Sequence, residues 1–265
     1  MKLIFRIGLA ATLHAFLVQP ASAQWQDKWQ GSLGLAARSA THTEYDGAGN
    51  RIVRENGWLP GLALNAGYRT GRITWLGGLD WYQGDIDYQG RTQGGAAAAS
   101  TTATRLASAH LGAAWDLGND YTALAAFELD HWKRDIRGTG TSAGLQETYR
   151  SRRLVAGARK TWHPGGAAVS AEAAVVVAEP ERLRVGFSGL LDPVAFDTRR
   201  GHGVRLGAGW HPAFAPRVAL RARYDWLKVA RSGDAPLTLN GQFAGTVAQP
   251  EHTRRGVTLT IATVF

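Results

Sequence analysis

Three polar residues on two neighbouring segments have the types and spacing that nucleophilic chemistry requires. Ser108 and His110 are two residues apart, so on an extended strand they face the same side, and Asp80 on the preceding segment could orient the histidine. A serine activated in this way can hydrolyse or transfer a lipid acyl chain. The alternative is that Ser108 and His110 are packed interior residues, and we favour it because a lone histidine is more often a member of a hydrogen-bond network.

The segments that carry these residues alternate in polarity with a period of two. At the C-terminus, Val257, Leu259 and Ile261 alternate with Thr258 and Thr260. The same alternation recurs in residues 73–82, 107–115, 122–130, 169–177, 203–210 and 217–226, with weaker versions at 32–38, 62–69 and 154–162. A period of two is typical of β-strands with one apolar and one polar face.

The connections between these segments alternate in length. Short turns rich in Gly, Pro and Asn lie at 70–71, 117–120, 163–166 and 211–216, and longer loops lie near 45–56, 89–102, 138–144, 188–198 and 231–250. Outer-membrane barrels have this asymmetry, with short periplasmic turns and longer extracellular loops. The pattern therefore predicts an all-β fold, a transmembrane antiparallel β-barrel of about ten strands.

The first 23 residues have the features of a secretory signal peptide. Lys2 and Arg6 precede an apolar run, and Ala21-Ser22-Ala23 forms a small-x-small cleavage site. We expect cleavage after Ala23, leaving residues 24–265 as one outer-membrane barrel domain in a bacterial outer membrane. The net charge of +9 does not suggest nucleic acid for such a chain, and the sequence contains no metal-ligand cluster, phosphate loop or nucleotide motif. We therefore expect no metal and no cofactor.

The polar face of the strands carries charges, and the other face is aliphatic. In a soluble β-sandwich or lipocalin-like barrel the aliphatic face would point inward, whereas a closed sheet with charged residues inside is stable only in lipid. The residues expected to line the interior are Asp80, Glu128, Asp130, Glu172, Arg153, Arg159, Arg205, Arg221, Arg223 and Asp225. Because buried charges must be paired or solvated, we predict an ion-pair network that plugs the lumen; the alternative is a narrow conduit.

Basic residues fall near the outer ends of several strands. Arg105, Arg150, Arg152 and Lys228 form an outer rim, where arginine could bind the phosphate groups of lipopolysaccharide. The alternative is that these are ordinary solvated charges. The terminal Phe265 after an alternating strand resembles the C-terminal signature that the barrel-assembly machinery reads.

Ten strands, basic rim residues and a carboxylate pair together resemble the omptin proteases. In that family an Asp-x-Asp pair faces an Asp-x-His pair across the barrel mouth and activates a water molecule. Asp85 and Asp87 match the first pair by spacing, but the second pair is missing. Strict alternation also directs Asp85 and Asp87 away from the lumen, so the resemblance covers strand number and layout and not the catalytic set.

These observations favour a non-enzymatic outer-membrane barrel with a charge-plugged lumen. We expect it to act through its surface loops, in adhesion, envelope structure or accessory export, with residues 93–104 and 231–250 as candidate contact surfaces. An omptin-like protease or lipid-modifying enzyme is the first alternative, and a narrow solute channel is the second.

Overall fold

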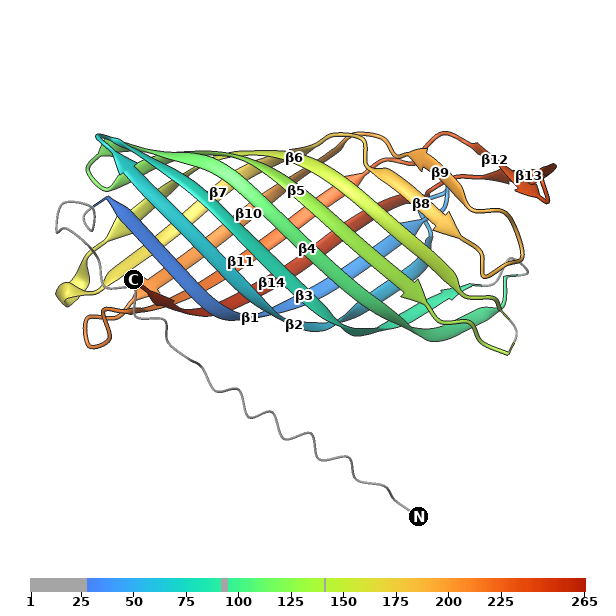
Figure 1. Cartoon of the computed structure of the whole chain (residues 1–265), viewed down its shortest axis with the longest axis horizontal. Coiled ribbons are helices and arrows are strands. Elements are labelled where there is room, and N and C mark those ends of the chain that lie inside the picture. The colour runs from blue at the N-terminus through green and yellow to red at the C-terminus, as the bar shows by residue number, and fades with distance from the viewer. Residues whose placement is uncertain (1–27, 92–94, 141) are drawn as a thin grey trace, which may run out of the picture.

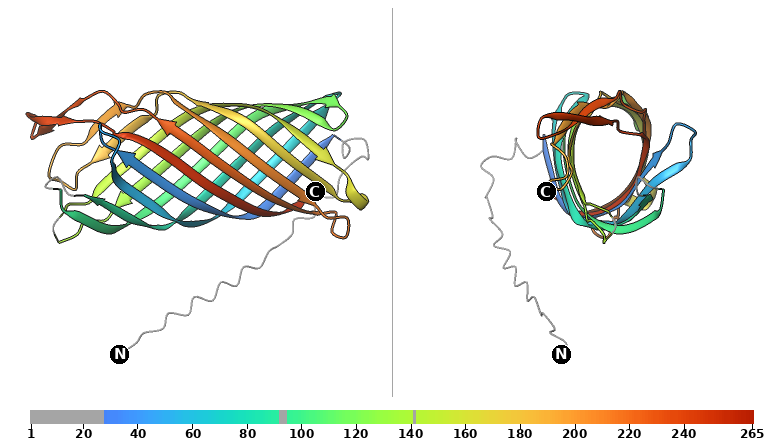
Figure 2. Two further views of the ribbon diagram at one scale, coloured as in Figure 1. Left: turned by 180° about the vertical axis from the view of Figure 1, so that it is seen from behind. Right: turned by 90° about the vertical axis from the view of Figure 1, so that its right-hand side faces the viewer.

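The computed structural model describes residues 28–91, 95–140 and 142–265. The predicted signal peptide and its cleavage site lie outside the described residues. In the described part of the chain, ten strands form a closed antiparallel barrel (Figures 1 and 2). They are β1 (Trp29–Tyr45), β2 (Arg51–Thr70), β3 (Ile73–Arg91), β4 (Ala97–Gly118), β5 (Tyr121–Ile136), β6 (Leu145–Trp162), β7 (Ala168–Ala178), β10 (Gly201–His211), β11 (Val218–Val229) and β14 (Glu251–Val264).

Each barrel strand pairs with the next along the chain, and β1 pairs with β14 to close the ring. The pairing of β1 with β14 runs from Ser32 opposite Val264 to Tyr45 opposite Glu251. A short 3-10 turn, Pro164–Gly166, connects β6 to β7. No helix among the described residues is long and apolar enough to cross a membrane. The predicted fold class and the number of strands are confirmed.

Four further strands form an extension at the outer end of the barrel. β8 (Arg182–Gly186) and β9 (Val194–Asp197) continue the β7–β10 hairpin after short interruptions, and β8 also pairs with β6. β12 (Ala235–Leu239) and β13 (Gln242–Val247) form a separate hairpin within the connection from β11 to β14. Asp192 joins the two parts, because its carboxylate accepts hydrogen bonds from Thr238 (2.7 Å) and the Gly241 amide (2.9 Å).

The strands run farther outward than the sequence predicted. β2 begins at Arg51, β3 continues to Arg91 and β4 begins at Ala97, so most of the expected loops 45–56, 89–102 and 93–104 is strand. That part of the prediction was wrong because apolar alternation marks only the part of a strand whose outer face is apolar. Beyond that part the hydrogen-bond ladder continues while the outward side chains become polar and small.

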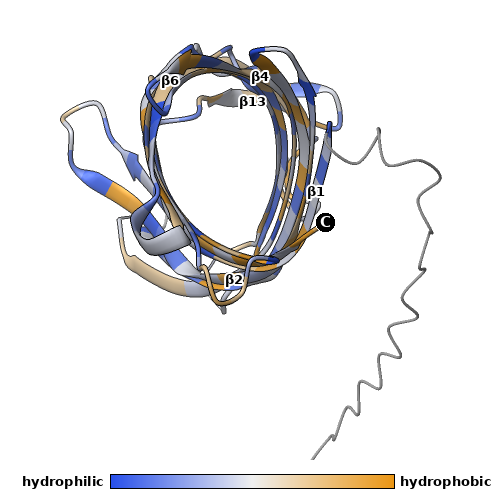
Figure 3. Ribbon diagram, turned by 90° about the vertical axis from the view of Figure 1, so that its left-hand side faces the viewer, coloured by the Kyte–Doolittle hydropathy of each residue, from blue (hydrophilic) through white to orange (hydrophobic). Residues whose placement is uncertain are grey.

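The aliphatic side chains lie on the outside of the barrel. Leu111 is 71% exposed and Leu259 is 48% exposed, whereas Arg205 on the inward face is 7% exposed. Viewed along the barrel axis, the strands form a closed ring that carries both hydrophilic and hydrophobic residues (Figure 3). A sheet that exposes leucine and buries arginine is the inverse of a soluble β-sandwich.

Exposed tryptophans mark the two edges of this apolar belt. Trp75 and Trp115 project outward at the end of the barrel where the chain turns are short, and Trp58 and Trp81 project outward nearer the other end. Tryptophan is enriched at both membrane–water interfaces of outer-membrane barrels. The strands beyond Trp58 and Trp81, together with the extension, therefore form the outer part of the molecule.

Candidate functional site

The barrel interior contains two separate groups of charged side chains. We call the first the middle network; its members are Arg38, Asp80, Glu128, Asp130, Arg153, Arg205, Arg223 and Asp225. We call the second the outer cluster; its members are His42, Glu44, Glu55, Arg134, Glu147, Tyr149, Glu181, His252 and Arg254. All members except Glu181, which lies between β7 and β8, occupy inward-facing positions of barrel strands.

Arg205 lies at the centre of the middle network. Its Nη1 and Nη2 donate to the two oxygens of Glu128 (2.5 and 3.1 Å), and its Nε donates to Oδ1 of Asp225 (2.7 Å). The guanidinium therefore binds carboxylates from two other strands, β5 and β11. Such bidentate contacts fix both geometry and charge.

The remaining arginines of the middle network complete the pairing. Nη2 of Arg153 lies 3.0 Å from Glu128 and 2.5 Å from Asp130. Nε of Arg223 lies 3.1 Å from Asp225, and its Nη2 lies 3.7 Å from Asp80. Arg38 of β1 also reaches Asp225, at 3.4 Å.

The middle network is balanced in charge, with four carboxylates against four guanidinium groups. Seven of the eight were among the residues expected to line the lumen, and Arg38 was missed because it ends a weakly alternating segment. Of the other expected residues, Arg159 pairs with Glu172 at 2.8 Å. Arg221 forms no hydrogen bond or ion pair with any described residue.

Arg134 is the centre of the outer cluster. It is 2% exposed, and its guanidinium contacts Glu55 (2.9 Å), Glu44 (3.6 Å), Glu147 and the hydroxyl of Tyr149 (3.2 Å). These partners come from β2, β1 and β6. One buried arginine is thus shared among three carboxylates.

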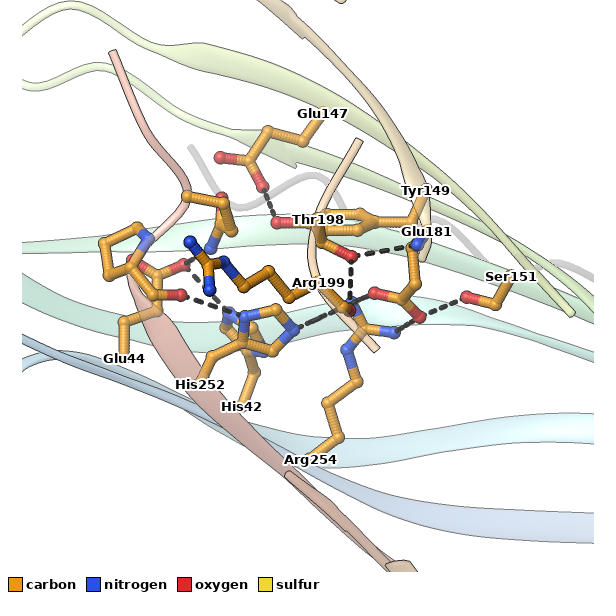
Figure 4. Close-up of polar contacts among 12 residues, drawn as sticks. His42, Glu44, Glu147, Tyr149, Ser151, Glu181, Thr198, Arg199, His252 and Arg254 are labelled. Carbon is orange, nitrogen blue, oxygen red and sulfur yellow. Dashed lines mark hydrogen bonds and ion pairs between the residues drawn. The ribbon is translucent and has the colours of Figure 1, made fainter. Parts of the chain in front are cut away.

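Arg254 and Glu181 form the second half of the cluster (Figure 4). Nη1 and Nη2 of Arg254 donate to the two carboxylate oxygens of Glu181, each at 2.6 Å, and Ser151 donates a further hydrogen bond to the same carboxylate. Glu181 lies in the interruption between β7 and β8, where its amide donates to Oγ1 of Thr198 (2.9 Å). The glutamate follows Pro180, which cannot donate to a strand ladder, and this proline is the signal that could have located it.

Two histidines lie side by side in the cluster, with ring centroids 5.0 Å apart. Nε2 of His42 bonds Glu44 (2.9 Å), and since a carboxylate only accepts, that nitrogen carries the proton. Nδ1 of His252 faces the carbonyl of Pro250 (3.2 Å), while its Nε2 faces Nη2 of Arg254 (3.3 Å). Nε2 of His252 also lies 3.8 Å from Glu181. The partners of His42 fit a neutral ring, because Nε2 faces an acceptor and no hydrogen-bond partner among the described residues faces Nδ1.

The outer cluster therefore has an excess of acid. Four carboxylates, Glu44, Glu55, Glu147 and Glu181, face two guanidinium groups, so carboxylates outnumber guanidinium groups by two. All four carboxylates are buried. A buried excess of negative charge is unfavourable, so the cluster favours proton uptake by one of its carboxylates.

The outer cluster lies beyond the apolar belt. His42 is three positions past Ser39, which pairs with Trp58 of the belt edge, and the outward neighbours of Arg134 are Lys133 and Asp135. Burial and the adjacent Arg134 lower the pKa of His42. Burial, with Glu44 and Glu55 nearby, raises the pKa of Glu147 despite the opposing charge of Arg134.

The connection from β11 to β14 covers the outer cluster. The side chain of Gln249 donates from Nε2 to Glu44 (3.0 Å). The backbone N–H of Gln249 donates to Oγ of Ser232, at the other end of the connection (2.9 Å). Both residues are buried. The cluster has the groups needed for general acid–base chemistry, and a pocket lined by His42, Trp132 and Arg254 reaches it.

The structure separates the catalytic candidates proposed from the sequence. Asp85 and Asp87 point outward, and Asp85 forms an exposed ion pair with Arg137 (2.7 Å). Ser108 and His110 do face inward from β4, but no hydrogen bond joins them among the described residues, and Asp80 contacts Arg223 instead. No group of three His, Cys, Asp or Glu in the described part of the chain has the geometry of a metal site.

Of the predicted rim residues, Lys228 lies next to the outer end of β11, whereas Arg105, Arg150 and Arg152 lie farther along β4 and β6. They also differ in their contacts. Arg105 donates to Gln83 (3.1 Å), and Lys228 pairs with Glu251 (2.8 Å). Arg150 and Arg152 are exposed, and Arg152 pairs with Glu179 at 3.8 Å. Together with Arg182 and Glu179 they line an outside depression of about 980 Å³. Its remaining wall is largely apolar and includes Leu62, Leu79, Trp81, Ala107, Ala109 and Leu129.

Comparison with known proteins gives one solved structure that supports the fold. The structure is similar to the outer membrane protease OmpT from Escherichia coli, with 11% sequence identity, coverage of 93% of this chain and 99% of that chain, and a TM-score of 0.58. It also matches the translocator domain of autotransporter NalP from Neisseria meningitidis, with 11% identity, 89% and 88% coverage and a TM-score of 0.45. The beta domain of the Bordetella autotransporter BrkA is 15% identical, with 88% and 100% coverage and a TM-score of 0.42. No protein-family model and no curated protein matches the sequence. The barrel thus resembles the omptin-like outer-membrane barrels in fold.

Proposed function

We propose that this protein is a non-enzymatic outer-membrane barrel with a closed lumen, which acts at the cell surface through its outer extension. The observation that carries this proposal is the middle network, in which four arginines and four carboxylates from β1, β3, β5, β6, β10 and β11 bind one another across the lumen. Breaking such a network leaves buried charges without partners. Ion pairing across the lumen therefore opposes the passage of solutes.

Planar-bilayer conductance tests the closed lumen. We expect the purified wild-type barrel to give no stable current steps. A double variant, Arg205→Ala with Glu128→Ala, removes the central pair together and serves as the control that an opened barrel is detected. Stable steps from the wild type would favour the narrow-channel alternative and overturn the proposal.

Contact surfaces for adhesion, envelope structure or accessory export are available on the extension. Leu190, Leu239 and Phe243 are 62%, 46% and 72% exposed, and Asp192 holds the loops that carry them against each other. Exposed apolar side chains on an ordered surface are typical of protein contact sites. Deletion of residues 235–247 should abolish surface attachment or partner capture while the barrel still assembles; retention of both would contradict a role for the extension.

An omptin-like or lipid-modifying activity is the alternative, and the outer cluster is the observation that favours it. The cluster places His42 beside Glu44 and His252 near Glu181 at the outer end of the lumen. Peptide hydrolysis and lipid deacylation assays should detect no turnover if the barrel is non-enzymatic. Turnover that is lost in both His42→Gln and Glu44→Gln would establish the enzymatic alternative.

We also propose that the outside depression contacts lipopolysaccharide. Arg150, Arg152 and Arg182 lie at its outer edge, where they can pair with phosphate groups, and its apolar wall can accept acyl chains. The double variant Arg150→Ala/Arg152→Ala should lose binding to lipopolysaccharide, whereas Arg54→Ala, an exposed arginine on β2, should retain it. Unchanged binding by the double variant would count against this contact.

Assembly through the C-terminal strand is the last part of the proposal. Phe265 is 74% exposed, while its backbone exchanges two hydrogen bonds with Gly31 of β1 (2.8 and 3.0 Å). We propose that the barrel-assembly machinery recognises this exposed side chain. Phe265→Ala should lower the amount of assembled barrel in cells, with its stability after refolding unchanged; normal assembly would contradict this role.

A further inference from the structure

The end of the lumen opposite the outer cluster is hollow. A cavity of about 420 Å³ begins near the ends of β1, β10 and β14, where Gln30, His211 and Val264 line it. The middle network, through Glu128, Arg205 and Arg223, lies at its inner limit. We call this cavity the periplasmic cup, because it opens at the end with short turns and is closed above by ion pairs.

Small inward-facing residues create the space. Gly67 of β2, Ala126 of β5 and Gly207 and Gly209 of β10 line the cup. A Cβ atom at Gly209 would lie 2.6 Å from Oγ of Ser170, so even alanine would crowd the cup wall there. The volume is within the range of ligand pockets, which are about 300–1,000 Å³.

Arg221 is the charged side chain of the cup that has no partner among the described residues. It is exposed within the cup, and no described residue gives it a hydrogen bond or an ion pair. The nearby carboxylates are already engaged: Glu172 accepts from Nε and Nη2 of Arg159 (3.2 and 2.8 Å), and Asp80 lies against Arg223. The cup wall therefore has a surplus positive charge, and this charge comes from a planar donor that favours oxyanions.

We propose that the periplasmic cup is a binding site for a small oxyanion, a phosphate or a carboxylate, held by Arg221. A free ion and the terminal carboxylate of a peptide share this chemistry. Because the middle network closes the cup above, the ligand enters and leaves from the periplasmic end. The site is separate from the outer extension, so it does not depend on the surface activity proposed above.

Ligand-observed NMR on the refolded barrel in micelles tests the site. The probes are inorganic phosphate, trialanine with a free carboxylate, and trialanine amide. We expect saturable binding of phosphate or of the free peptide, at least about tenfold weaker binding to Arg221→Gln because a charge-assisted pair is lost, and little binding of the amide. Arg217→Gln is the matched control, since Arg217 is exposed just before the same strand and does not line the cup.

The outcomes separate the two sources of the ligand. Binding of phosphate alone indicates a free anion, and preference for trialanine over its amide indicates a chain end; each supports the site. No saturable binding of either probe, or equal binding by wild type and Arg221→Gln, overturns the proposal. Arg221 has no partner among the described residues, so Arg221→Gln should fold. A urea unfolding midpoint of Arg221→Gln equal to that of the wild type would verify this.

Discussion

The middle network and the outer cluster both place charged side chains inside the barrel, but they differ in the ratio of carboxylates to guanidinium groups. In the middle network each carboxylate faces a guanidinium, and Arg205 alone ties β10 to β5 and β11. In the outer cluster Arg134 is shared among Glu44, Glu55 and Glu147, so negative charge exceeds positive charge unless protons are taken up. The balanced group suits a permanent plug, whereas the acid-rich group is sensitive to the removal of a cation and to pH.

The largest expected effect is at the two central arginines. Arg134→Met leaves three buried carboxylates without their shared cation and should destabilise the barrel by about 5 kcal/mol, at the upper end for a broken buried pair. Arg205→Met leaves Glu128 beside Arg153 and Asp225 beside Arg223, so we expect about 3 kcal/mol. Urea unfolding in lipid vesicles, followed by tryptophan fluorescence, measures both. An equal or larger loss for Arg205→Met would break the distinction between the two groups.

Neutralising one carboxylate should destabilise the middle network more than the outer cluster, the reverse of the order expected for the arginine variants. Glu128→Gln removes one of four balanced acids and leaves Arg153 and Arg205 short of a partner, which should cost about 3 kcal/mol. Glu147→Gln reduces the acid excess around Arg134 and should cost less than about 1 kcal/mol. The same unfolding assay compares them, and a greater cost for Glu147→Gln would contradict an acid excess in the outer cluster.

The pH dependence should follow from the outer cluster. Because burial and Arg134 lower the pKa of His42, the unfolded chain binds a proton below about pH 6.5 that the folded barrel does not, and stability falls as the pH falls. His42→Gln should remove up to about 1.4 kcal/mol per pH unit of that slope. The raised pKa of Glu147 acts in the opposite direction. The stability that protonated Glu147 contributes is lost as the pH rises through its pKa in the folded barrel.

Urea midpoints between pH 7.5 and 5.5 measure this dependence. His202→Gln is the matched control, since His202 is exposed on the outside of β10. The control should keep the wild-type slope. An unchanged slope in His42→Gln would show that His42 does not couple protons to folding.

The smallest expected effect is at the pair between Arg159 and Glu172. Arg159 is 37% exposed at its side chain and Glu172 is 21% exposed, so water can solvate either charge when its partner is removed. Arg159→Met should therefore cost no more than about 1 kcal/mol. A loss as large as that of Arg205→Met would mean that the periplasmic cup is drier than its open end indicates.

The candidate site shows where reading the sequence failed. Alternation located the inward carboxylates and arginines of the middle network, because those residues lie within the lipid belt and their neighbours are aliphatic. It missed the outer cluster, because beyond the belt both faces are polar, as at His42, Glu55 and Arg134. Glu181 was also missed, since it lies in a strand interruption where a period of two does not apply.

The sequence by itself determined the fold class, the sidedness of the sheet and the number of barrel strands, because each depends on local periodicity and on the length of the connections. Only the tertiary structure decided which charges meet. Closure of the barrel pairs β1 with β14 and places residues of five or six strands at the same level along the barrel axis. No local sequence pattern encodes that level. The ion pairs in the lumen, the acid excess around Arg134 and the absence of a partner for Arg221 among the described residues all depend on how the strands are shifted against one another in the closed barrel.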